Sequence, residues 1–461
     1  MFDDVAVPER WRLGENSVPK GRYIDLEFLE LELERLFPRT WLMACRLEEV
    51  AQVGAFVELE VGDESIVVVR PDTGQVRAFF NSCRHRGTRL VRGSGRLGEF
   101  RCPFHAWRWD LGGALTDRPD DASFAPRPAG ELCLAECRCD TWGGFVFVNM
   151  DPDAEDLDEY LAPLPARLEG FKLQEMRYRW HKRVVVPANW KTAVDAFIEA
   201  YHVPGTHPQF LRPRLTPATP ATRAEVPLWP PSVTESHGRH ARTRKPTPDP
   251  EQVEPIARAT ARSGLTPLEQ TQVFVEYQLR ELGSLNTDWD RRALERVLAG
   301  ELPEDPFEQH LRYLATRREM AAADGVRLPD LTPEQVRAGA YDWLVFPNTV
   351  LLVTGTVGSV LGYRALPDGH DPDSCVFDMW SMQLFAPGAA PDVTTEVFED
   401  WHDAALGEVL TQDLGNLAAV TAGMHSRSFD AAHLNLRQEM SIHHYHQTAD
   451  GYLFGSGGDA G

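Results

Sequence analysis

The sequence has little positive charge for its length. Its 461 residues include 47 Lys and Arg against 69 Asp and Glu, which gives a formal net charge of −22. Proteins that bind nucleic acid usually carry a basic excess on the binding face, so we expect no nucleic-acid partner. The chain also lacks a run of about 18 apolar residues and, at its start, a basic stretch followed by an apolar one. We therefore expect no membrane span, no secretory signal and a cytoplasmic protein.

Cysteine is also scarce. The chain contains seven cysteines, an odd number, so thiols and metal ligands are expected rather than a framework of disulfides. The hydrophobic content of 43% is nevertheless sufficient for a sizeable core, and the length suggests two or three domains.

Strand signals divide the chain into an all-β part and a mixed part. Short runs rich in β-branched and aromatic residues occupy 54–81 and 143–150, with Gly-Asp and Pro-Asp-Thr-Gly turns between them. We predict an α+β protein with an all-β domain over 38–155, a catalytic domain over 156–461, and an N-terminal segment, 1–37, that packs on the catalytic domain.

Helices are predicted inside the second domain. The stretch "NWKTAVDAFIEAYH" contains no Pro or Gly, so we predict one helix that continues to His202 and is ended by Pro204 and Gly205. A long helix is predicted over 393–426. The histidine-rich run at 443–446 is interpreted as a strand face or a subunit contact, because alternation would place two of its histidines on one side.

A helical insertion is predicted over about 250–338. Thr266 and Thr332 each offer an N-cap hydroxyl, with proline at the first helical position and Glu or Gln two residues later. Asp305 offers a similar helix start.

Two short stretches each combine one cysteine with one histidine. Cys83 and His85 lie in "CRHRG", and Cys102 and His105 lie in "CPFHAW". Two thiolates and two imidazoles fit either a tetrahedral zinc site or a [2Fe–2S] cluster with two cysteines on one iron and two histidines on the other. Zinc fingers usually group the cysteines and the histidines separately, whereas here each loop supplies one of each. The cluster is therefore favoured, and zinc remains the alternative.

These two stretches resemble the Rieske motif of the Rieske non-haem iron ring-hydroxylating oxygenases, in their α (large, catalytic) subunits. The resemblance implies that Cys83, His85, Cys102 and His105 hold a Rieske [2Fe–2S] cluster. It also places Trp107 as an aromatic residue packed beside the cluster. The cluster would receive electrons derived from NAD(P)H through a separate ferredoxin or flavin reductase.

A second constellation lies further along the chain. On the predicted helix, Asp195, Glu199 and His202 stand at i, i+4 and i+7 and therefore share one face. His207 follows five residues later, and a chain reversal at Pro204-Gly205 would return it to the same point. Two neutral histidines and one carboxylate form the facial triad of non-haem Fe(II) oxygenases, which leaves positions open for O₂ and substrate.

This stretch resembles the second signature of the same family. The resemblance implies that His202 and His207 ligate a mononuclear Fe(II). It also places Glu199 as the acidic residue that bridges this site to a Rieske histidine of the neighbouring subunit, here His105. Many members carry Asp at that position, and Glu is longer by one methylene. Asp195 and Asn189 are candidates for orienting the ligands.

The third iron ligand has to come from elsewhere in the chain. The family takes an Asp from a late helix, and Asp413 is our choice because it lies in an apolar-periodic helix, where an unpaired carboxylate would be costly. Asp403 and Glu408 are weaker rivals.

The resemblance also implies a fold and an activity. The fold is an all-β Rieske domain on a helix-grip catalytic domain with an antiparallel sheet and a long C-terminal helix. The activity is that of a terminal oxygenase component, which uses O₂ to mono- or cis-dihydroxylate, or oxidatively demethylate, an aromatic or other hydrophobic substrate. Small or apolar neighbours of the ligands are the predicted substrate contacts: Ala196, Phe197, Val203 and Val409.

Partners follow from the same resemblance. We expect an α3 or α3β3 oligomer, with a β subunit as a possibility left open. The alternative class is an electron-transfer or binding protein that keeps the cluster and lacks the mononuclear iron.

Overall fold

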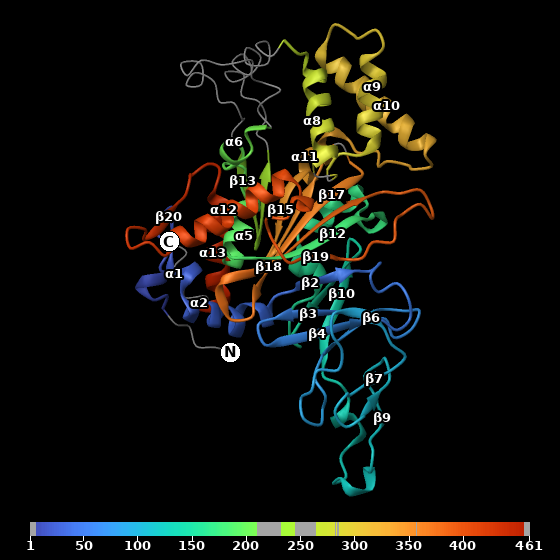
Figure 1. The fold of residues 1–461 in the computed structure, drawn as a ribbon, viewed down its shortest axis with the longest axis vertical. Helices are drawn as coiled ribbons and strands as arrows, with labels where there is room; N and C mark the ends of the chain where they lie inside the picture. The colour runs from blue at the N-terminus through green and yellow to red at the C-terminus, as the bar shows by residue number, and fades with distance from the viewer. Residues whose placement is uncertain are drawn as a thin grey trace.

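The computed structural model describes residues 6–209, 232–244, 264–281, 283, 285–355 and 357–455. Its overall arrangement is shown in Figure 1, with β-rich segments of the first third of the chain at one end and a group of helices at the other. The first part of the predicted helical insertion, 250–263, lies outside the described residues.

The predicted all-β region forms two antiparallel sheets. Within the described residues, the larger has seven strands in the order β2-β11-β10-β5-β4-β3-β6, and the smaller has the order β7-β8-β9. Runs of β-branched and aromatic residues favour the strands of the larger sheet, and β4 and β11 bury nearly every side chain. Its strands are β2 (Leu42–Arg46), β3 (Ala55–Val61), β4 (Glu64–Val69), β5 (Arg77–Phe80), β6 (Ser94–Arg96), β10 (Glu136–Trp142) and β11 (Phe145–Asn149), and the smaller sheet consists of β7 (Phe100–Arg101), β8 (Arg108–Trp109) and β9 (Leu115–Asp117).

The second region is built on a sheet that has eight strands within the described part of the chain, in the order β13-β14-β15-β16-β17-β18-β12-β19. All neighbours are antiparallel except β12 and β19, which run parallel. The sheet and its covering helices confirm the predicted α+β class. The strands are β12 (Arg177–Val186), β13 (Val233–His237), β14 (His240–Arg244), β15 (Tyr341–Val345), β16 (Thr349–Val353), β17 (Ser359–Asp368), β18 (Asp371–Gln383) and β19 (Glu396–Phe398).

Helices from both halves of the chain cover one side of this sheet (Figure 1). The covering helices are α5 (Trp190–Phe197), α12 (Glu408–Met424) and α13 (Met440–Leu453), and the connection from the first region runs through α3 (Leu157–Leu161) and α4 (Leu164–Leu168). None of the described helices is both long and apolar enough to cross a membrane.

The N-terminal segment lies against the C-terminal helices. Strand β1 (Ser17–Pro19) pairs with β20 (Ala431–His433), and the helices α1 (Gly21–Ile24) and α2 (Leu26–Leu31) follow β1. The Arg22 guanidinium is fully buried and pairs with Asp450 at 2.7 Å. The segment thus contacts the region for which we predicted it.

The helices of the insertion begin where the sequence predicted. α8 (Pro267–Glu281) starts after Thr266, α10 (Pro306–Ala323) after Asp305 and α11 (Pro333–Gly339) after Thr332. Both halves of the capping box form at Thr332 and Gln335. Together with α9 (Asp288–Leu298), α8 and α10 form a helical group at the end of the molecule opposite β7 and β9 (Figure 1).

The predicted helix through His202 is wrong in its second half. α5 ends at Phe197, so Glu199 and His202 do not share a helix face with Asp195. The Glu199 carboxylate accepts the backbone N–H groups of Tyr201 and His202, which replaces helical bonding there. Pro204 lies in the first turn of a short helix, α6 (Val203–Thr206), and does not end one.

Two C-terminal predictions also need correction. The helix expected over 393–426 is confined to α12, because β19 and turns that Asp400 and Asp403 cap occupy the residues before it. The histidine-rich run is part of α13 and not of a strand. Burial at Ile442, Tyr445 and His446 follows helical spacing.

Candidate metal centres

The two Cys/His loops have the same backbone design. In the first, the Gly87 N–H donates to Cys83 O and the Cys83 N–H donates to Thr88 O, both at 2.9 Å. In the second, the Ala106 N–H donates to Cys102 O at 3.1 Å and the Cys102 N–H donates to Trp107 O at 2.9 Å.

Both loops turn through a left-handed residue. Gly87 has φ 75° and Ala106 has φ 59°, a conformation that glycine adopts at low cost and alanine does not. The two loops therefore have the same backbone frame, with the cysteine at the same position and the histidine two residues later in the first loop and three residues later in the second.

The four side chains of these loops lie together. The rings of His85 and His105 are 4.7 Å apart between centroids, and Trp107 stacks on His85 at 4.9 Å with an interplanar angle of 1°. Among the described residues, His85 Nδ1 is buried and has no hydrogen-bond partner, which fits a ligand atom. Trp107 is buried, at the place predicted for it.

The two cysteines differ electrostatically. Burial raises the pKa of Cys83, and the hydrogen bond it shares with Cys102 raises that pKa further. Burial acts in the same direction on Cys102, but the backbone N–H groups of His105 and Phe104 outweigh it and lower the pKa of that thiol. Amide groups directed at sulfur stabilise thiolate, the form that binds metal. These residues fit a Rieske cluster.

The second centre combines the two histidines that flank α6 with one residue of α12. Ligand atoms of His202, His207 and Asp413 all lie within 4.8 Å of one another, although Asp413 is more than 200 residues away in sequence. His207 Nε2 is 2.9 Å from Asp413 Oδ1, and His202 Nε2 is 3.8 Å from the same oxygen. Asp403 and Glu408, the weaker rivals, are not part of this group.

The other nitrogen of each histidine is held by an oxygen that can only accept. Glu199 Oε1 is 2.5 Å from His202 Nδ1, and Gln412 Oε1 is 2.8 Å from His207 Nδ1. Both Nδ1 atoms therefore carry the proton, and the Nε2 atoms, which face Asp413, are the ones a metal ion would use. Two imidazole nitrogens and a carboxylate oxygen at one point fit a divalent iron.

Charges around His202 favour its protonated form when no cation is present. Burial lowers the pKa of His202, but the bond to Glu199 and the charges of Asp413 and Asp342 outweigh burial and raise that pKa.

Gln412 was not predicted from the sequence. Its carbonyl oxygen also accepts from Gln209 Nε2 at 2.7 Å, so it joins the loop after α6 to α12. The available signal is its position directly before Asp413. Arg86 was likewise missed: its Nη2 lies 2.7 Å from His105 Nε2.

Asn189 and Asp195 have other hydrogen-bond partners. Asn189 is the N-cap of α5, and its amide donates to the carbonyl oxygens of Tyr23 and Pro372. Asp195 accepts the Tyr23 hydroxyl at 2.6 Å, and burial raises the pKa of Asp195 to about 7. Any effect of these residues on the ligands is therefore indirect.

The predicted substrate contacts lie in different surroundings. Phe197 stacks on Tyr363 at 4.1 Å and on Phe377 at 5.3 Å, and Val409 is buried on α12. Ala196 and Val203 are half-buried. Substrate contact by these four residues stays a prediction.

Two family models match the chain. Residues 40–129 match the Rieske [2Fe-2S] domain, and residues 173–279 and 304–454 match the ring hydroxylating alpha subunit (catalytic domain). The second match covers more than half of the 461 residues. The chain therefore belongs to the family of ring-hydroxylating oxygenase α subunits and contains a Rieske domain, as the sequence motifs predicted.

Relatives at the sequence level act on different substrates. The chain is 31% identical over 231 residues to the glycine betaine monooxygenase oxygenase subunit of Chromohalobacter salexigens, covering 47% of this chain and 51% of that one. It is 34% identical over 216 residues to the carnitine monooxygenase oxygenase subunit of Escherichia coli, covering 46% and 58%. It is 33% identical over 190 residues to the biphenyl 2,3-dioxygenase α subunit of Rhodococcus jostii, covering 40% and 41%. The chain spans about half the length of the relatives it matches.

Solved structures share the fold over nearly the whole chain. A quaternary ammonium Rieske monooxygenase in complex with L-carnitine aligns with a TM-score of 0.61 at 18% identity, covering 98% of this chain and 96% of that one. Naphthalene 1,2-dioxygenase from Rhodococcus sp. aligns with a TM-score of 0.61 at 20% identity, covering 96% and 95%.

Proposed function

We propose that this protein is the terminal oxygenase component of a Rieske oxygenase system. It would use O₂ and electrons derived from NAD(P)H to hydroxylate or demethylate a small organic substrate. The observation that carries the proposal is the convergence of His202, His207 and Asp413 within 4.8 Å in a chain with a Rieske domain. The overall change is R–H + O₂ + 2e⁻ + 2H⁺ → R–OH + H₂O, and cis-dihydroxylation uses the same electrons and protons.

The residues have separate tasks in this proposal. Cys83, His85, Cys102 and His105 hold the cluster, and Trp107 shields it from water. His202, His207 and Asp413 hold Fe(II), which supplies O₂ activation when bound. Residues 38–155 form the Rieske domain, and 156–461 form the catalytic domain.

Glu199 is proposed to link the two centres across a subunit interface. Its carboxylate already binds His202 Nδ1. The loop between β7 and β8, which carries His105, lies at the far end of the molecule from α6 (Figure 1). A second copy of the chain is therefore the natural source of the cluster that faces Glu199, which supports an α3 or α3β3 assembly.

The proposed substrate is a small molecule that is either apolar or able to bind the faces of aromatic rings. The stacked rings of Phe197, Tyr363 and Phe377 lie between α5 and the sheet. Aromatic faces bind other rings and also quaternary ammonium groups. L-Carnitine, glycine betaine, biphenyl and benzene, which the relatives' names include, form the first panel for turnover.

The test begins with metal and acid-labile sulfide content of anaerobically purified protein, with its EPR spectrum after reduction. We expect about three irons and two sulfides per chain, two of the irons in the cluster and one in the facial triad. The Asp413→Ala variant is the matched control and should retain only the cluster. A cluster with no third iron, even after reconstitution with Fe(II), would refute the oxygenase and leave an electron carrier. Zinc without sulfide would refute both.

A further inference from the structure

A buried ion cluster lies on the side of the large catalytic sheet that faces the Rieske domain. Asp378 of β18 is fully buried and is the direct cross-strand partner of Arg364 on β17 and of Arg183 on β12. Arg364 Nη2 and Nε donate to Asp378 Oδ2 at 2.6 and 3.1 Å, and Arg183 Nε donates to Asp378 Oδ1 at 2.7 Å. The carboxylate thus holds two guanidinium groups in fixed positions.

Within the described part of the chain, Arg364 forms hydrogen bonds with the Rieske domain, whereas Arg183 interacts with it through the charge of Glu49. Arg364 Nη1 donates to the backbone oxygens of Met43 at 2.6 Å and Ala44 at 2.9 Å, in β2. β2 is the edge strand of the Rieske sheet, and its register with β11 shifts at this point, so Ala44 is left over as a β-bulge. A bulge disrupts the ladder locally, and Arg364 binds the carbonyl groups of this stretch.

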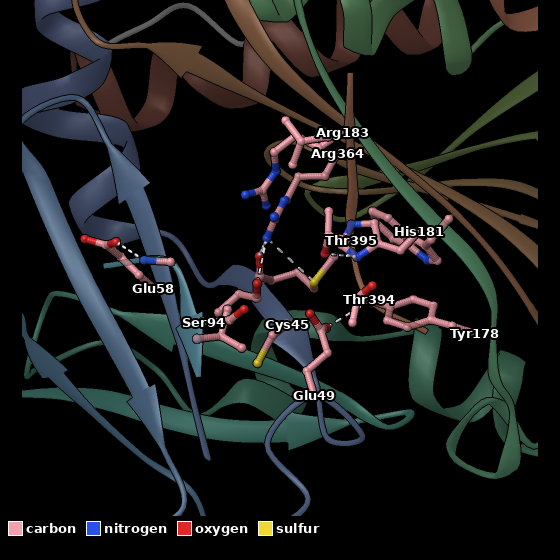
Figure 2. A pocket seen from close by; sticks show the side chains of 16 residues that line it. Cys45, Glu49, Glu58, Ser94, Tyr178, His181, Arg183, Arg364, Thr394 and Thr395 are labelled. Atoms are coloured by element: carbon pink, nitrogen blue, oxygen red, sulfur yellow. Dashed lines mark hydrogen bonds between the residues drawn. The ribbon is translucent and has the colours of Figure 1, made fainter. Parts of the chain in front are cut away.

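The packing beside this contact is open. A cavity of about 240 Å³ separates the two domains, with Glu49 and Ser94 on the Rieske side and His181 and Thr395 on the catalytic side. Figure 2 shows Arg183 and Arg364 side by side at one end of this cavity. Beside the cavity, few contacts other than those of Arg364 therefore fix the angle between the domains.

Several other polar contacts lie where the chain passes between the domains. Arg46 donates to the carbonyl oxygens of Leu173 and Met176, and Glu48 and Glu49 bind Tyr178. A further pair, His370 with Asp63 at 3.1 Å, is exposed, and such pairs contribute little. The two domains also share one hydrophobic core, and Arg239 pairs with Glu155 at 2.6 Å. Loss of Arg364 is therefore expected to change the tilt of the Rieske domain and not to release it.

Residues adjacent to this cluster in the same strands face the opposite side of the sheet, where the metal triad lies. Side chains alternate along a strand, so Tyr363 and Phe377 point away from the Rieske domain, toward Phe197 at the end of α5. The rigid sheet thus joins the Arg364 contact on one face to the helix that precedes His202 on the other.

We propose that Arg364 is a positioning residue that sets the orientation of the Rieske domain on the catalytic sheet and thereby the rate of electron transfer from the cluster to the mononuclear iron. This inference rests on the proposed function. It holds whether the receiving iron belongs to the same chain or to another copy, because in either case the cluster moves with its domain.

The test compares Arg364→Met with Arg183→Met in the iron-loaded protein. Both remove one guanidinium from Asp378, but only the first removes the bonds to β2. We expect hydrogen exchange of 42–46 to accelerate in Arg364→Met and to stay unchanged in Arg183→Met. Equal exchange in Arg364→Met and the unaltered protein would overturn the inference, whatever the panel compounds do.

A second experiment separates electron transfer from the oxygenation of the substrate. The chemically reduced protein is mixed with O₂ and the panel compound that turns over, and reoxidation of the cluster is followed by its absorbance. We expect it to slow about tenfold or more in Arg364→Met, because electron transfer depends on how the cluster is placed relative to the iron. Turnover driven by H₂O₂, which carries the oxygen and both electrons, should be retained.

Several outcomes decide between the possibilities. Equal losses with O₂ and H₂O₂ would indicate general damage and overturn the positioning role, as would equal slowing in Arg183→Met. Partial recovery in Arg364→Lys, which keeps the charge but has fewer donors, would support it. If no compound turns over in the unaltered protein, the proposed function fails while the exchange measurement still tests the contact.

Discussion

The bond between Gln412 and His207 gives a quantitative prediction for metal binding. Gln412 Oε1 accepts from His207 Nδ1 at 2.8 Å and thereby directs Nε2 toward Asp413. Losing such an orienting partner typically weakens metal affinity by about 10- to 100-fold, which corresponds to about 1.4–2.8 kcal/mol. We therefore expect Gln412→Ala to bind Fe(II) about 10- to 100-fold more weakly, while folding stability falls by only about 1 kcal/mol.

The opposite change should have the opposite sign. In Gln412→Glu a carboxylate would accept the same proton, and a charged acceptor makes a stronger bond and a more basic imidazole. We expect tighter Fe(II) binding by that variant. The control is Asn416→Ala, one turn further along α12, whose amide bonds the Thr206 hydroxyl at an exposed position.

Anaerobic titration of the metal-free proteins with Fe(II) measures the dissociation constants of the three variants and of the unaltered protein. The reasoning would be refuted if Gln412→Ala bound iron like the unaltered protein, or if Asn416→Ala lost as much affinity.

Three further predictions concern other parts of the chain. Arg317→Met leaves Asp290 buried without its cation, which lies at 2.6 Å, so urea unfolding of the insertion should lose about 3–5 kcal/mol; a loss near zero would show that the pair is dispensable. Cys102→Ser should abolish acid-labile sulfide and keep the mononuclear iron, and loss of both metals would mean that the two centres fold together. Asp195 has its pKa raised from 3.8 to about 7 by burial, so the native state binds the extra proton and stability falls as pH rises from about 4 to 7, approaching about 4 kcal/mol at about 1.36 kcal/mol per pKa unit. Urea unfolding of Asp195→Asn should lack this fall, and an identical pH profile would disprove it.

Local chemistry was readable from the sequence wherever neighbouring residues decide the structure. Thr332 and Gln335 form the predicted capping box because both partners lie within one turn. The Cys83 and Cys102 loops were likewise predictable, since each ligand pair is only a few residues apart and followed by a turn.

Predictions failed where a side chain replaces the hydrogen bonds of a helix, or where contacts with distant residues determine the structure. The end of α5 could not be read from "NWKTAVDAFIEAYH", because propensity favours a helix there. The Glu199 carboxylate binds two amide groups beyond it, and the hydroxyls of Thr243 and Ser441 donate to the Ile198 carbonyl oxygen. The helix α13 contains His443 and His446, whose burial depends on Gly14 and Tyr23 from the other end of the chain. Gln412 was missed for the same reason: its partner is 205 residues away.

The two proposed iron histidines are not equivalent, and the fold accounts for the difference. His202 is held by the Glu199 carboxylate and His207 by a neutral amide. A charged acceptor makes the stronger bond and the more basic imidazole, so His202 should be the stronger donor to a metal. At the break after α5, Glu199 Oε2 accepts the backbone N–H groups of Tyr201 and His202 while Oε1 faces His202 Nδ1, so the same carboxylate ends the helical bonding and orients the imidazole. The same carboxylate that tunes His202 is the group proposed to face the neighbouring cluster, so the stronger ligand lies on the side from which electrons would arrive.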